Sequence, residues 1–142
     1  MPSSTAKPTN STPTALDNVS VPKPNDVNSL ALDCPKIDST TYISRIGQSF
    51  QFVCAMDYQG NSPAAQRNGT VKDLVGLIAY SVDDCIEACS EMNEYLGGCG
   101  AITFKADMSL SVKLFRANCW LKNTSGRGIP KENTLVSAKL LP

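Results

Sequence analysis

Apolar and polar residues alternate along several short stretches of the chain, which is the pattern of strands with one buried face. In residues 49–54 (SFQFVC), for example, Phe50 and Phe52 stand on either side of Gln51. Residues 74–80 (LVGLIAY) form a short apolar run of the length typical of a strand. We expect strands in both stretches and also in residues 99–106, 118–123 and 134–141.

The stretch between Ser81 and Gly97 has helical spacing, because apolar residues and cysteines recur there every three or four positions. Ser81 is a suitable N-cap for this helix, and Gly97-Gly98 is a strong stop signal. Residues 108–115 (MSLSVKLF), in contrast, are expected to form a turn with room for a short strand. The residues that share one face of the predicted helix are Cys85, Cys89, Met92 and Leu96.

One helix among several short strands predicts an α+β fold with an antiparallel sheet, which we place at residues 34–142. Residues 1–33 are rich in Ser, Thr, Pro and Asn and have no periodic pattern, so we predict an extended linker or an assembly arm. Residues 17–24 (DNVSVPKP) hold the β-branched Val19 and Val21, and we expect them to dock on a neighbouring copy. Residues 134–141 (TLVSAKLL) are an equal candidate for the docking strand.

Composition and charge reduce the number of functions that the chain could have. The chain has 142 residues, enough for one domain, with 13 Lys plus Arg and 13 Asp plus Glu. The formal net charge is therefore zero, and no excess of positive charge favours binding to nucleic acid or to an anionic membrane. No apolar run approaches the roughly 20 residues that span a bilayer, so we expect no membrane span.

The chain contains no histidine, which removes the commonest general base and metal ligand. No Gly-rich phosphate loop, calcium loop or nucleophile motif is present. The carboxylates of Asp57 and Asp73 have no neighbour at a spacing that suggests acid–base catalysis. We therefore expect a protein that is not an enzyme and that has no cofactor and no metal.

Six cysteines admit three interpretations. Zinc sites favour close Cys-x2-Cys pairs, and redox dithiols favour Cys-x-x-Cys at a helix N-terminus, whereas Cys85 and Cys89 are four residues apart. Positions i and i+4 lie on one helix face, so two bridges from this face would attach the helix to a sheet. Structural disulfides fit this spacing best, and the small core makes them valuable. The six residues are Cys34, Cys54, Cys85, Cys89, Cys99 and Cys119.

An even number of cysteines together with four Asn-x-Ser/Thr sequons favours an extracellular protein, secreted or associated with a cell wall. No apolar leader follows Met1, which indicates either a processed chain or a fragment of a longer one. The candidate glycosylation sites are Asn10, Asn18, Asn68 and Asn123.

The capped helix with Cys-x3-Cys precedes a strand that opens CGAITF and a later strand that carries NCWLK. These motifs together resemble the PAN/Apple superfamily. The CP at residues 34–35, the segment SFQFVCAMDYQG and the late CWLKN are similar to PAN modules of secreted fungal proteins. The resemblance covers residues 34–142, and it implies a sheet wrapped around one helix.

The resemblance also implies three bridges, which are Cys85–Cys119, Cys89–Cys99 and, with those two placed, Cys34–Cys54. Apple domains of plasma proteins tie their two termini together with a disulfide. This chain has no cysteine after Cys119, so it departs from that pattern.

By analogy with the superfamily we expect a non-catalytic recognition module that binds a protein or glycan ligand. The alternative is a glycosylated structural subunit of an extracellular filament or matrix that self-associates through the N-terminal arm. A secreted inhibitor of a host enzyme is neither supported nor excluded. We interpret Trp120 as a core residue, with stacking on a sugar ring as the alternative. The candidate ligand contacts are Tyr42, Tyr58, Tyr95 and Trp120.

Overall fold

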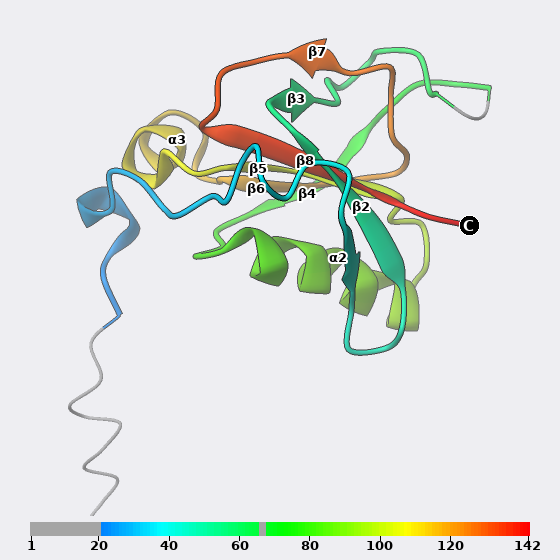
Figure 1. The fold of residues 1–142 in the computed structure, drawn as a ribbon, viewed down its shortest axis with the longest axis horizontal. Helices are drawn as coiled ribbons and strands as arrows, with labels where there is room; N and C mark the ends of the chain where they lie inside the picture. Colours follow the sequence, from blue (N-terminus) through cyan, green and yellow to red (C-terminus); the bar gives the residue numbers. More distant parts are fainter. Residues whose placement is uncertain (1–20, 66–67) are drawn as a thin grey trace, which may run out of the picture.

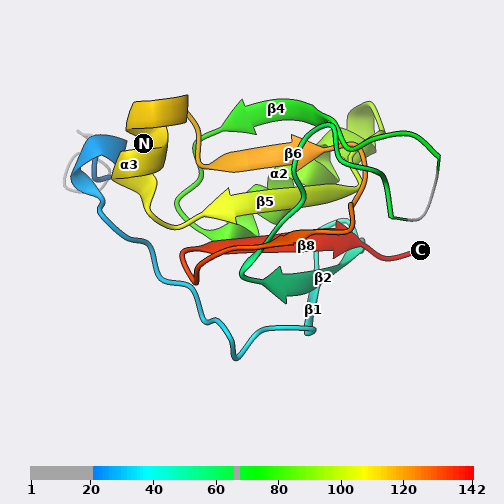
Figure 2. The same ribbon diagram turned by 90° about the horizontal axis from the view of Figure 1, so that it is seen from above.

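The computed structural model describes residues 21–65 and 68–142, which form an α+β fold (Figure 1). The strands of the main sheet are β1 (Thr41–Ile43), β2 (Ser49–Cys54), β4 (Asp73–Leu77), β5 (Ala101–Lys105), β6 (Cys119–Lys122) and β8 (Leu135–Leu140). They pair in the order β1-β2-β8-β5-β6-β4, and every pair is antiparallel (Figure 2). The strands β3 (Met56–Asp57) and β7 (Ile129–Pro130) form a second, two-stranded sheet.

The predicted helix is confirmed as α2 (Val82–Tyr95), which lies across one face of the main sheet (Figure 1). The hydroxyl of Ser81 caps it by accepting a hydrogen bond from the backbone N–H of Asp84. The helix stops at Leu96, and Gly97 follows with a φ of 73°, which glycine adopts without strain. Leu96 is the C-cap and is 84% exposed, so it does not pack with the buried Cys85 and Cys89, with which we expected it to share a face.

The core lies between α2 and the sheet. Successive residues of a strand point to opposite faces, so alternate residues of the central strands meet the helix. In β5 these are Ile102 and Phe104, and in β6 they are Cys119 and Leu121. Phe50 and Phe52 of β2 and Ile86 of α2 complete the largest part of the core.

Three disulfides hold this layer together, and they are the three pairs that the resemblance implies. Cys85–Cys119 and Cys89–Cys99 join α2 to β6 and to the start of the segment that leads into β5. Cys34–Cys54 attaches the N-terminal segment to the end of β2. Every cysteine of the chain is therefore bridged.

Residues 108–115 form a second helix, α3 (Met108–Phe115), so the expected turn with a short strand is wrong. Apolar and polar residues alternate in MSLSVKLF, which imitates a strand locally. As a helix the segment buries Met108 and Ser111, and the Ser111 hydroxyl donates to the carbonyl oxygen of Ala117 at 2.6 Å. Tertiary packing at one end of β5 thus decides between the two local patterns.

Residues 21–33, which we assigned to the linker, pack against the domain. The 3₁₀ helix η2 (Pro24–Asp26) lies beside α3 (Figure 2), and the backbone N–H of Ser109 donates to the Val27 carbonyl. Leu30 donates its backbone N–H to Ala106 and packs against the core. The folded body therefore extends N-terminal of Cys34. The rest of the predicted arm, including Asn10, Asn18 and residues 17–20 of the segment 17–24, lies outside the described residues.

The C-terminal strand β8 lies in the middle of the sheet. It pairs with β2 on one side and with β5 on the other, so both of its edges already have hydrogen-bonding partners. A strand paired on both edges cannot also dock on another molecule by strand addition. The expectation that residues 134–141 could be a docking strand is therefore wrong.

Candidate functional site

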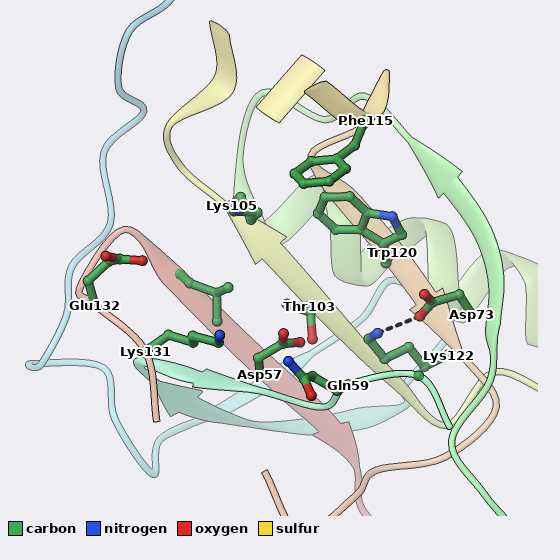
Figure 3. Close-up of a pocket in the computed structure, with 12 residues that line it drawn as sticks. Asp57, Gln59, Asp73, Thr103, Lys105, Phe115, Trp120, Lys122, Lys131 and Glu132 are labelled. Carbon is green, nitrogen blue, oxygen red and sulfur yellow. Dashed lines mark hydrogen bonds and ion pairs between the residues drawn. The ribbon is translucent and has the colours of Figure 1, made fainter. Parts of the chain in front are cut away.

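A pocket of about 390 Å³ lies on the face of the main sheet opposite α2 (Figure 3). Its base is formed by side chains of β5, β6 and β8. One wall comes from the end of α3, and the opposite wall comes from β3 and the residues that follow it. The pocket is therefore built from segments far apart in the sequence.

The register of the strands explains which side chains reach this base. Thr103 on β5 is paired with Trp120 on β6, and directly paired residues of an antiparallel sheet point to the same face. The neighbours Cys119 and Leu121 point the other way, where Cys119 is bridged to α2. Trp120 and Lys122 must therefore face away from the helix, and both line the pocket.

The wall nearest α3 is aromatic. The half-buried Trp120 meets the ring of Phe115 edge to face, with centroids 6.0 Å apart, and Phe115 is 55% exposed. Gly76 lies opposite Trp120 on β4, where a Cβ atom would come 3.2 Å from the Ala117 Cβ and 3.4 Å from the indole Nε1, so the tighter of these contacts is with Ala117. The ammonium of Lys105 lies 5.2 Å from the Phe115 ring centroid, within the range of a cation–π interaction.

An ion pair lies at the floor of the pocket. The ammonium of Lys122 donates to a carboxylate oxygen of Asp73 on the edge strand β4 (Figure 3). The Lys122 side chain is almost completely buried, whereas the Asp73 side chain is about half exposed. A buried cation is stable only with such a partner. The Asp73 carboxylate is thus open to anything that enters the pocket, whereas the Lys122 ammonium is enclosed and holds the carboxylate in place.

The opposite wall carries polar side chains on a segment that is anchored from below. Asp57 and Gln59 face the pocket, and Tyr58 between them points into a small buried cluster. The Ser137 hydroxyl of β8 donates to the Met56 carbonyl at 2.6 Å, which holds β3 over the sheet. This wall is therefore part of the folded scaffold.

Of the four aromatic residues expected to contact a ligand, only Trp120 lines the pocket. Trp120 forms part of the pocket wall, so our interpretation of it as a core residue is wrong. Tyr58 is 3% exposed, so its assignment as a surface contact is wrong, and burial raises its pKa to about 12. The Tyr42 hydroxyl donates to Glu87 of α2, and burial together with this carboxylate raises the Tyr42 pKa. Tyr95 is exposed at the end of α2, away from the pocket.

Several pocket residues were missed by the reading of the sequence. Alternation within CWLK carried the necessary signal, because a Cys119 bridged to the helix sends Trp120 and Lys122 to the other face. No comparable local signal exists for Phe115 or Gln59. Their positions depend on where α3 and the segment after β3 pack.

The two described sequons differ in their surroundings. Asn68 is exposed in the loop before β4. Asn123 follows β6, and its carboxamide accepts from the backbone N–H of Lys72 and donates to the carbonyl of Thr70. The Asn123 side chain therefore connects this loop to the sheet.

The structure also bears on other classes of site. Within residues 21–65 and 68–142, no group of three or more Cys, Asp or Glu side chains is placed to hold a metal ion. No helix in the described part of the chain is long and apolar enough to cross a bilayer.

Comparison with known proteins found no matching family model, no matching curated protein and no matching solved structure.

Proposed function

We propose that the chain is a non-catalytic extracellular recognition module of the PAN/Apple type that binds a protein or carbohydrate ligand. The observation that carries this proposal is the pocket opposite α2. It combines an exposed aromatic wall with a buried ion pair at its floor. A concave site with apolar walls and a few convergent polar groups is the usual form of a ligand site.

The scaffold supports the same function. Two disulfides attach α2 to the side of the sheet opposite the pocket, and a third fixes the end of β2. A site on a rigid scaffold loses little conformational entropy when it binds. Three disulfides also suit an oxidising location, such as the extracellular space or a cell wall, and the exposed Asn68 sequon suits a glycoprotein.

Binding to arrays of glycans and of extracellular proteins tests this proposal. The folded, fully oxidised chain is compared with Trp120→Ala, Phe115→Ala and Tyr95→Ala. We expect the wild type and Tyr95→Ala to retain the same ligand, because Tyr95 lies on α2 away from the pocket, and the two pocket variants to lose it. Binding that survives both pocket substitutions, or no binding by the wild type to any array, would overturn the proposal.

A further inference from the structure

The pocket has features that select one class of ligand, and this inference rests on the proposed function. We propose that the pocket binds a neutral pyranose, a sugar ring of a glycan without a charged group. The ring would place its C–H face on the aromatic wall of Trp120 and Phe115. Its hydroxyl groups would meet Asp73, which Lys122 holds in place from below, and Gln59.

The first argument is size and position. A volume of about 390 Å³ lies at the lower end of the range for small-molecule sites, roughly 300–1,000 Å³. The pocket also lies on the face of the sheet, whereas an extended peptide adds to a free sheet edge. A compact ring fits this position better than a strand of protein.

The second argument is charge. Three lysines and three carboxylates line the pocket, so their formal charges cancel. Lys122 is already paired with Asp73. An anionic sugar or a phosphate favours a site with an excess of Lys or Arg, and a cationic ligand favours the opposite excess. The charged lining residues are Asp57, Asp73, Glu132, Lys105, Lys122 and Lys131.

The third argument is the pattern of donors and acceptors. The enclosed ammonium of Lys122 donates to the Asp73 carboxylate, whose side chain is half exposed. The Asp73 carboxylate has further acceptor positions, and the Gln59 side-chain amide can both donate and accept hydrogen bonds. A hydroxyl group both donates and accepts, so sugar hydroxyls can donate to the half-exposed Asp73 and exchange hydrogen bonds with the exposed Gln59, while the enclosed Lys122 holds Asp73 in place.

The fourth argument is the aromatic wall. Phe115 exposes more than half of its surface while its ring contacts Trp120. Trp120 leaves part of its indole open to the pocket. The C–H groups of a pyranose give such rings an apolar partner, while the opposite polar wall remains available for the hydroxyl groups.

Trp120 is the only tryptophan of the chain, so its fluorescence reports directly on the pocket. The full oxidised chain is titrated with the methyl glycosides of glucose, galactose, mannose and N-acetylglucosamine. Glucuronic acid and glucosamine are the charged probes, and a peptide of mixed sequence is the protein probe. We expect a saturable change with at least one neutral glycoside, with a Kd on the order of 1 mM, and none with the charged sugars.

Variants that keep Trp120 locate the site. Gln59→Ala and Phe115→Leu change exposed side chains and leave the core intact, whereas Lys122→Met removes the buried ammonium. Each is expected to weaken binding about tenfold, and Tyr95→Leu is expected to leave it unchanged. An unchanged Kd in both Gln59→Ala and Phe115→Leu would overturn the assignment to this pocket.

The remaining outcomes separate the two proposals. A response to glucuronic acid, glucosamine or the peptide without a response to the neutral glycosides overturns the neutral-sugar inference and leaves a recognition pocket. No response to any probe, together with no ligand on the arrays, overturns both.

Discussion

The ammonium of Lys122 on β6 lies 2.5 Å from a carboxylate oxygen of Asp73 on the neighbouring edge strand β4. The lysine side chain is 4% exposed and the aspartate side chain is 47% exposed. The anion thus faces water and the cation is enclosed, so the two partners depend on each other unequally. Lys122 cannot recover its hydration if Asp73 is lost, because it is already buried beneath the pocket.

We expect Asp73→Asn to lower the free energy of unfolding by about 1–3 kcal/mol, because it leaves a buried ammonium without its counter-charge. Lys122→Met should lower it less, since methionine fills similar space without a charge. Urea denaturation with the disulfides intact measures both, and Asp26→Asn on the exposed part of η2 is the control. A larger loss in Lys122→Met than in Asp73→Asn would contradict this account of the pair.

Asn118 connects three segments through one buried carboxamide. Its Oδ1 accepts from the Ala79 N–H at 2.8 Å, and its Nδ2 donates to the carbonyl oxygens of Ala79 and Lys105 at 2.8 and 3.3 Å. Asn118→Ala should lower the free energy of unfolding by about 2–4 kcal/mol, because backbone groups are left without partners. Asn133→Ala, in an exposed loop, should change it by less than about 0.5 kcal/mol. Thermal and urea unfolding measure the stability of both variants. Equal losses in Asn118→Ala and Asn133→Ala would show that the Asn118 carboxamide contributes nothing specific.

The two disulfides of α2 close loops of different length. Cys85–Cys119 spans 34 residues and Cys89–Cys99 spans 10, and all four cysteines are buried. Loop entropy predicts that replacing the first pair by alanines costs about 1 kcal/mol more than replacing the second. Urea unfolding of the two double variants measures the difference. A smaller loss for the longer loop would mean that packing around each bridge outweighs chain entropy.

We expect Tyr58 to make the free energy of unfolding depend on pH in the alkaline range. Burial raises its pKa to about 12 from the usual 10.0 of a tyrosine, so the folded state holds the phenol proton more tightly than the unfolded state does. Its contribution of about 2–3 kcal/mol is fully present below pH 10 and is lost as the pH rises through the folded pKa. Short unfolding experiments at increasing pH measure this loss.

The matched variant for this experiment is Tyr58→Phe, which keeps the ring and removes the titrating group. We expect its stability to fall less steeply than that of the wild type between pH 10 and pH 12. Absorbance titration of the phenolates should show one late-titrating group fewer in the variant. Identical curves for the two proteins would rule out Tyr58 as the source.

Alternation and capping made much of the fold predictable. The strand at 49–54 and the helix that begins after Ser81 are both recognisable because their signals are local. The α3 segment was not recognisable as a helix, because MSLSVKLF has an alternating pattern. The helix is stabilised by tertiary packing, in which Met108 is buried. Spacing alone placed Leu96 on the face of Cys85 and Cys89, but Leu96 is the C-cap of the helix and is exposed.

The sequence by itself determined the class of the protein, an α+β domain of zero net charge with a capped helix that carries two cysteines on one face. These properties follow from composition and from spacing within a single element. Only the tertiary structure decided that Trp120 is a pocket wall and Tyr58 a buried residue. It also decided that Asp73, Lys122 and Phe115 meet around one cavity. Strand order and the packing of α3 set these contacts. Pairing between segments far apart in the sequence cannot be inferred from the local pattern of either segment.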